Sequence, residues 1–214
     1  MSNRFYRNTT GGSNVASGYQ ALYFNTTGLY NVASGYRAGY INTTGNNNTF
    51  IGNQANASTN NLTNATAIGN GAVVNGNNKV RIGDISVSVI EGQVGFSASS
   101  DRRLKTNIVP NQKGLDFISK LQPVTYQWKE GDTETVHDGF IAQDVEAAMN
   151  ELGITFSGLN KPKTEQDHYS LQYSTFVVPL VNAVKEQQAT IQQQSAEIAD
   201  LKARLQRIEA ALAK

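Results

Sequence analysis

The chain has 214 residues, a formal net charge of +1, no cysteine and two histidines, His137 and His168. Disulfides and thiolate metal sites are therefore excluded, two histidines are too few for a His-rich metal site, and the near-neutral charge gives no reason to expect nucleic acid as a partner. The sequence contains no run of about 18 apolar residues, so we do not expect a membrane span. Neither a metal nor a cofactor is expected.

Charge is distributed unevenly along the chain. Residues 1–99 contain five basic and two acidic residues, whereas residues 100–214 contain 13 basic and 15 acidic residues. So abrupt a change predicts two architectures joined near position 100. We expect a repetitive fibre segment over 1–99, a small domain over 100–175 and a helical tail over 176–214.

The first segment is an internal repeat. The motif NTTG occurs at 8–11, 25–28 and 42–45, and NVASGY occurs at 14–19 and 31–36. Glycines recur every 17 residues, and a shorter step of 14 leads to the last: Gly18, Gly35, Gly52, Gly69 and Gly83. Glycine at a fixed phase predicts one tight turn with positive φ per repeat, with two brief strands between the turns. Because each repeat has few apolar residues, coils and chains are expected to stack to bury them. A disordered Asn/Gly-rich linker is the alternative, but it would not require apolar residues to keep phase with the repeat.

A possible nucleophile and base lie at the junction SASSDRRLKTNI, residues 97–108. Ser100 and Lys105 are five residues apart. A serine hydroxyl needs a base to become a nucleophile, and a lysine amine can be that base when burial or nearby positive charge favours its neutral form. Arg102 and Arg103 place positive charge nearby. By spacing alone, a polar segment that leads into the next domain is the preferred interpretation of these residues.

Residues 100–175 read as a small mixed α+β domain. The pattern predicts a short helix over 115–121, a strand within 121–129, and a strand that turns into a helix over 138–152. The buried side of that last helix is expected to carry Ile141, Val145, Ala148, Met149 and Leu152.

Residues 176–214 predict one long helix with a heptad repeat. Apolar residues occupy the a positions and the later d positions, while Gln187 and Gln194 occupy the earlier d positions. Isoleucine at a with leucine and isoleucine at d is compatible with three parallel strands. The alternative is a single amphipathic helix packed on its own domain, which the narrow stripe disfavours. The predicted trimer interface consists of Val184, Ile191, Ile198, Leu201, Leu205, Ile208 and Leu212.

The repeat motifs NVASGY, NTFIGNQA and NATAIGNGA, within about residues 8–84, resemble the head repeats of trimeric autotransporter adhesins. That resemblance implies a trimeric left-handed β-roll. The expected fold class is therefore mixed: a homotrimeric β-solenoid head, a small α+β domain and a C-terminal parallel trimeric coiled coil.

The junction and the segments after it resemble a second family. SDRRLKTNI matches the S-D-x-x-L-K-x-N-I opening of the intramolecular chaperone domains of phage endosialidases and tail fibres, the S74 peptidases. The resemblance continues through LDFISKLQPVTYQWK, GFIAQDVEAAM and YSLQYSTFVVPLVNAVKEQ. It covers about residues 98–190 and is followed by the expected coiled coil.

This resemblance implies a domain that trimerises, assists folding of the preceding segment and then cleaves itself. It makes Ser100 the nucleophile, Lys105 the general base and Ser99–Ser100 the scissile bond. Asp101 and Arg102 fall within the motif and are supporting candidates that orient the turn or the dyad. His137, just before GFIAQDV, is a further candidate neighbour of the site.

The resemblance implies a phage tail fibre or spike on the virion, with the chain itself as trimer partner and a host-surface receptor or glycan as candidate partner of the parent fibre. One alternative is the same fold as a permanent trimeric foot that never cleaves. Another is a bacterial surface adhesin, which is expected to end in a membrane anchor rather than in a polar helical tail. Glycan hydrolysis by residues 1–99 is not expected, because Asp84 and Glu91 are their only acidic residues.

Overall fold

The computed structural model describes residues 6–162 and 167–212. The chain divides into two compact units. One contains the residues up to Gly95 together with Tyr126–His137, and the other contains Phe96–Thr125, Asp138–Lys161 and the chain from Tyr169 onward. None of the described helices is both long and apolar enough to cross a membrane.

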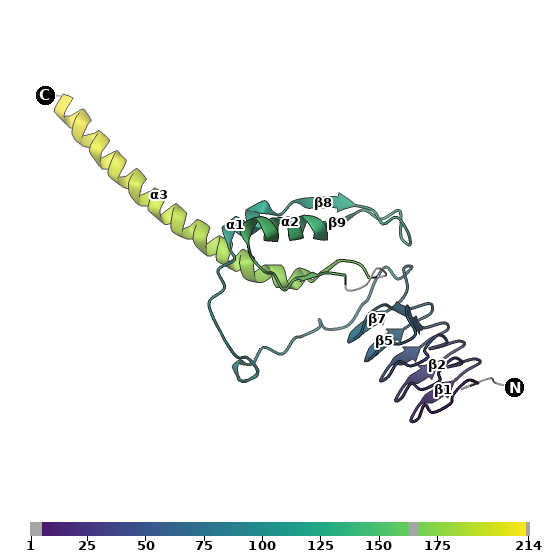
Figure 1. Cartoon of the computed structure of the whole chain (residues 1–214). Coiled ribbons are helices and arrows are strands. Elements are labelled where there is room, and N and C mark those ends of the chain that lie inside the picture. The colour runs from purple at the N-terminus through teal and green to yellow at the C-terminus, as the bar shows by residue number, and fades with distance from the viewer. Residues whose placement is uncertain (1–5, 163–166, 213–214) are drawn as a thin grey trace. The chain divides into compact units, whose positions relative to one another are not determined.

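The first unit contains a β-solenoid, as the repeat predicts (Figure 1). Five parallel strands form its main sheet, and equivalent residues of successive coils lie in register, so that Ala16 pairs with Ala33 and Ala33 with Phe50. A second sheet joins two shorter parallel strands. The main sheet consists of β1 (Val15–Ser17), β2 (Val32–Ser34), β3 (Thr49–Ile51), β5 (Ala65–Ile68) and β7 (Lys79–Ile82), and the second of β4 (Asn56–Ala57) and β6 (Val73–Val74).

Small side chains fill the interior of the solenoid. In β1 and β2 the middle residue points inward and its neighbours are exposed. Alanine dominates this core, and Phe50 is its largest fully buried side chain. Because coils of this size enclose little volume, one aromatic ring surrounded by alanines is enough to fill the local space.

The phased glycines permit close contact between coils. Gly18, Gly35 and Gly52 have φ values of 126°, 134° and 131°. A Cβ at Gly35 would overlap the carbonyl oxygen of Gly52 in the next coil. The prediction of a positive-φ turn at this phase is confirmed, and steric exclusion adds a second reason for glycine.

The expectation of two strands in every repeat is wrong for the early coils. A second strand is assigned only in later coils, at β4 and β6, among the residues the structure describes. The residues one and two periods before Ala57 are Tyr40 and Tyr23, whose rings stack with their centroids 5.6 Å apart. Ala57 and Val74 point into the core, whereas these tyrosines remain partly exposed, so the chain there follows a turn.

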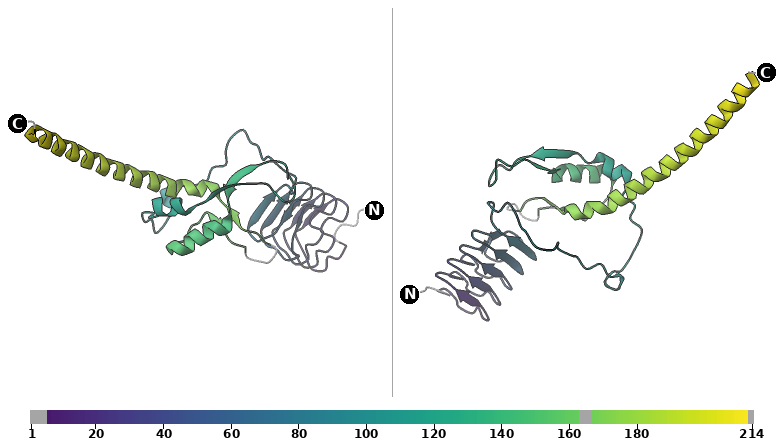
Figure 2. Two further views of the ribbon diagram at one scale, coloured as in Figure 1. Left: turned by 90° about the horizontal axis from the view of Figure 1, so that it is seen from above. Right: turned by 180° about the vertical axis from the view of Figure 1, so that it is seen from behind.

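The second unit is α+β, as expected (Figure 2). Its main core packs Phe117 of α1 against Phe156 and Phe176, with ring centroids 5.1 and 6.5 Å away, and Val145 and Met149 of α2 complete the cluster. Its elements are η1 (Arg102–Leu104), α1 (Leu115–Lys120), α2 (Ala142–Leu152), β10 (Leu159–Asn160), β11 (Ser170–Leu171), η2 (Tyr173–Phe176) and α3 (Val177–Leu212). Strands β8 (Pro123–Tyr126) and β9 (His137–Phe140) pair in a separate two-stranded sheet.

The helix predictions agree closely with the structure. α2 ends at Gly153, whose left-handed conformation, with φ 64°, lets its N–H bond back to the last turn. Val145, Ala148 and Met149 are buried as expected. The prediction is wrong for Ile141, which is 41% exposed because it precedes the first turn of α2 in an extended conformation.

Candidate functional site

A single tight turn brings the predicted Ser–Lys pair together. The Nζ atom of Lys105 donates a hydrogen bond to Ser100 Oγ, and the two atoms are 2.7 Å apart. The 3₁₀ turn η1 lies between these residues. A serine just before such a turn and a lysine just after it can therefore meet, although five positions separate them in sequence.

Asp101 holds the turn closed. Its carboxylate accepts the backbone N–H of Arg103 at 2.8 Å, which caps the turn, and its carbonyl accepts from the Leu104 N–H at 3.1 Å. The backbone N–H of Lys105 donates to the carbonyl of Arg102 at 3.1 Å, so the backbone at the candidate base is fixed. The orienting role expected of Asp101 is consistent with these contacts.

Arg103 is paired with Asp101. Its Nη2 atom lies 2.6 Å from Asp101 Oδ2, and Nε also donates to both carboxylate oxygens. The guanidinium holds the pKa of the Asp101 carboxyl below its usual value, and the carboxylate raises the pKa of Arg103. The positive charge expected to act on Lys105 is thus largely neutralised at Arg103, while the Arg102 side chain is exposed to solvent.

The candidate scissile bond is accessible. Ser99, Ser100 and Lys105 are all exposed in the single chain, as is the segment around them. A peptide bond must be reachable by water to be hydrolysed, and this one is. A water-filled surrounding, however, gives weak electrostatic stabilisation to a developing oxyanion.

His137 packs within its own hairpin. Its ring stacks on Tyr126 at 5.5 Å and lies 6.2 Å from Trp128. Its Nε2 atom is buried and has no hydrogen-bond partner within the described part of the chain. These contacts are those of a structural residue in the β8–β9 hairpin. Over residues 6–162 and 167–212, no cluster of three or more His, Asp or Glu side chains is arranged to hold a metal ion.

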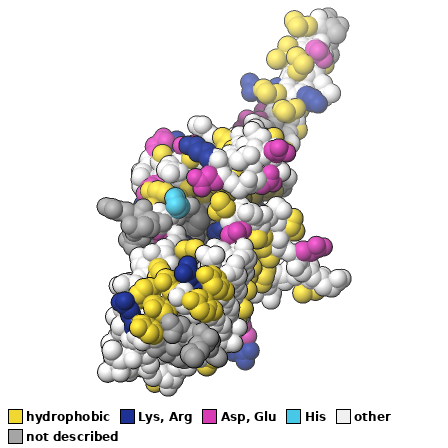
Figure 3. Space-filling view, turned by 90° about the vertical axis from the view of Figure 1, so that its right-hand side faces the viewer, with side chains coloured by type: hydrophobic (Ala, Val, Ile, Leu, Met, Phe, Trp, Pro, Cys, Tyr) yellow, Lys and Arg dark blue, Asp and Glu magenta, His cyan; other side chains and the backbone are white. Residues whose placement is uncertain are grey.

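The predicted trimer interface is an exposed apolar stripe on α3. Hydrophobic side chains recur along this helix between charged ones (Figure 3). Each of the seven predicted interface residues is more than half exposed: Val184 62%, Ile191 54%, Ile198 52%, Leu201 58%, Leu205 55%, Ile208 56% and Leu212 82%.

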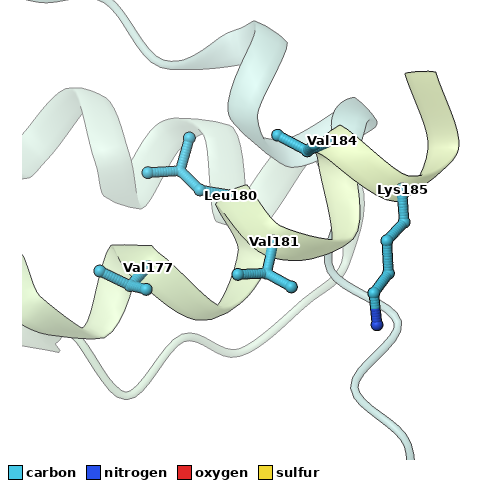
Figure 4. A pocket seen from close by; sticks show the side chains of 5 residues that line it. All are labelled: Val177, Leu180, Val181, Val184 and Lys185. Atoms are coloured by element: carbon cyan, nitrogen blue, oxygen red, sulfur yellow. The ribbon is translucent and has the colours of Figure 1, made fainter. Parts of the chain in front are cut away.

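The stripe continues from Val184, the first predicted interface residue, toward the start of α3. Val177, Leu180, Val181 and Val184 line an open apolar groove beside Lys185 (Figure 4). Val177 and Leu180 extend the a and d positions by one heptad. Their spacing was the signal that could have found them.

Residues 100–154 match the family model of peptidase S74, described as chaperone of endosialidase. The match begins at Ser100, includes Lys105 and ends just after α2, and it covers roughly a quarter of the chain. The segment is therefore similar to the chaperone domain of that family, in agreement with the motif. No curated protein matches the chain.

Proposed function

We propose that this chain is a self-cleaving intramolecular chaperone: it trimerises, assists folding of the repetitive segment before it, and then cuts the Ser99–Ser100 bond. The observation that carries the proposal is the 2.7 Å hydrogen bond between Lys105 Nζ and Ser100 Oγ, inside the segment that matches the chaperone family.

The chemistry requires the neutral form of the Lys105 amine. That amine accepts the Ser100 hydroxyl proton as Oγ attacks the carbonyl carbon of Ser99. The C–N bond then breaks as the proton passes to the backbone nitrogen of Ser100, which leaves an ester between Ser99 and the Ser100 oxygen. Water opens the ester, Ser99 becomes a free carboxylate and Ser100 regains its hydroxyl.

The partner in the proposal is the chain itself, as a homotrimer. Seven large apolar side chains at a and d spacing, all more than half exposed, are costly for a helix that stays single in water. Three parallel copies of α3 would bury them, and the mixture of isoleucine and leucine at a and d over 191–212 is compatible with a three-stranded coiled coil. Assembly would also raise the local concentration of the repetitive segments that must associate.

The proposed location is a phage tail fibre or spike on the virion, with the bacterial cell surface as the alternative. In either place the solenoid would remain after cleavage. A host-surface receptor or glycan is the proposed partner of the parent fibre.

The decisive experiment is an intact-mass measurement on the purified chain. Cleavage at Ser99–Ser100 gives fragments of 99 and 115 residues. Ser100→Ala should abolish both, Lys105→Met should slow their appearance strongly, and Ser97→Ala, which removes a nearby hydroxyl outside the dyad, should change nothing. An uncut wild-type trimer that behaves like Ser100→Ala would overturn the protease and leave a permanent trimerisation module.

That permanent module is the second candidate. It is favoured by one observation: the apolar stripe on α3 depends on neither Ser100 nor Lys105. The mass measurement separates the two candidates directly, because only the first produces fragments.

A further inference from the structure

The loop that follows the candidate dyad is bound to α3. The side-chain amide of Asn182 donates to the carbonyl oxygens of Asn111 and Lys113, at 2.8 and 2.9 Å. One turn further along α3, Glu186 Oε2 accepts the backbone N–H of Leu115 at 2.7 Å. We refer to Asn182 and Glu186 as the clamp. They join segments about 70 positions apart in sequence.

The fit around Glu186 is close. A Cβ at Gly114 would overlap the Glu186 carboxylate, so the loop passes directly against α3 at this point. The bond from Leu115 is charge-assisted, and such bonds are roughly twice as strong as neutral ones. The clamp also satisfies an N–H at the start of α1 that has no partner within that helix.

The clamp and the apolar stripe occupy different faces of α3. With Val184 at a, Asn182 is at f and Glu186 at c, both on the outward side of a coiled coil. Leu180 and Val184 are at d and a, on the side that would meet other copies. One helix therefore holds the loop with one face and leaves the other free for assembly.

We infer that Asn182 and Glu186 are positioning residues that couple assembly of α3 to cleavage at Ser100. This inference rests on the proposed function. Asn111 follows Lys105 by about six positions, so the extended chain between them can span about 20 Å at most. The clamp thus confines the exposed dyad turn to a limited volume beside the assembled helices, where a neighbouring copy can cover it. Without the clamp, the turn would sample many more positions.

The test uses the full chain, trimerised in acid and then shifted to about pH 8.5 to start the reaction, because an amine can act as a general base only in its neutral form. The first-order rate constant of fragment formation is measured by quenched intact mass. Asn182→Ala and Glu186→Ala should lower it about ten- to hundred-fold, the range expected for a misplaced reacting group. Glu186→Gln keeps an oxygen acceptor and should recover part of the rate.

Asp200→Asn is the matched control. Asp200 occupies the same c position two heptads later, and the substitution also changes a carboxylate to an amide. Its rate should equal that of the wild type. Trimer mass by light scattering, helix content and melting temperature are recorded for every variant, and hydrogen exchange at the Leu115 amide should be faster in Glu186→Gln than in Asp200→Asn.

Two different results distinguish a failure of this inference from a failure of the proposed function. If Glu186→Gln and Glu186→Ala trimers cleave at the wild-type rate while the Leu115 amide exchanges faster, the clamp does not position the dyad, although the proposed protease stands. If the wild-type trimer itself never cleaves, the proposed function fails and the inference fails with it.

Discussion

Placing charge in the apolar stripe of α3 should abolish both assembly and cleavage. Ile198 and Leu205 are 52% and 55% exposed in the single chain. Fully burying such a side chain is worth about 1.5–3 kcal/mol, so burying the exposed half adds about 1 kcal/mol each. Two positions in three chains therefore contribute about 6 kcal/mol, which is about four powers of ten in the association constant. Ile198→Asp with Leu205→Asp removes this contribution and places six carboxylates in the interface.

The assay has two parts. In a Ser100→Ala background, where the chain stays intact, sedimentation equilibrium reports the association state. In the native background, intact mass reports cleavage. The control, Ala196→Asp with Ala203→Asp, introduces the same two charges seven residues apart at outward f positions and should leave both readouts unchanged. A double Ile198/Leu205 variant that still forms trimers would refute the interface, and a monomer that cleaves at the wild-type rate would refute its coupling to chemistry.

Three further outcomes are expected in chemical and thermal unfolding. Phe50→Ala should cost about 3–5 kcal/mol, because the ring is fully buried among alanines and its loss leaves a cavity; a loss below about 1 kcal/mol would mean that the coils collapse around it. Gly35→Ala should destabilise the solenoid through its positive φ and its contact with the next coil, whereas Gly12→Ala, where the nearest atom is 3.7 Å away on a side chain, should be tolerated; equal effects would contradict the steric argument. Hydrogen bonding to Lys161, and secondarily to Tyr169, lowers the pKa of Glu146, so this contact stabilises the fold above the ordinary value of 4.5 and is lost as pH falls through the lower folded value. Glu146→Gln should therefore flatten the acid side of the stability–pH profile, and an unchanged profile would contradict the role of that contact.

The solenoid could be predicted from the sequence because the same residues recur at a fixed spacing of 17 positions. The phase of Gly18, Gly35 and Gly52 predicts both the turn and its positive φ, and the structure confirms both. A second strand was wrongly predicted in the early coils, because Tyr23 and Tyr40 have as high a β-propensity as Val74, which occupies the equivalent position in a later coil. Whether such a side chain stacks outside or packs inside is decided by the neighbouring coil, which local propensity does not include.

The sequence identified the two residues of the candidate dyad, but it did not predict the charges around them. The resemblance of SDRRLKTNI to the S74 motif, and not the spacing alone, selected Ser100 and Lys105, and the structure brings their side chains into contact. The pairing of Arg103 with Asp101 largely neutralises one of the two positive charges expected near Lys105, and this pairing depends on the side-chain geometry of a 3₁₀ turn. The clamp was missed because its bonds link Asn182 and Glu186 to backbone atoms about 70 residues away, and backbone partners leave no pattern in the sequence.

The interior of the solenoid gives a physical reason for a chaperone that leaves after folding. Four fully buried asparagines are satisfied mainly across coils: Asn42 Nδ2 donates to Asn25 Oδ1 at 2.8 Å, and the backbone N–H of Asn48 donates to Asn31 Oδ1 at 2.9 Å. A half-formed stack would leave such amides without partners, at about 1–3 kcal/mol each. Partly folded stacks are therefore costly, which makes the first coils slow to form and the complete stack slow to open. Help with folding is needed only once. The cost of unpaired amides, which slows formation of the first coils, also slows unfolding of the complete stack. Under the proposed function, cleavage at Ser99–Ser100 should leave the unfolding rate of the solenoid nearly unchanged while abolishing its refolding, and a released solenoid that refolds as readily as the uncut Ser100→Ala chain would contradict this reasoning.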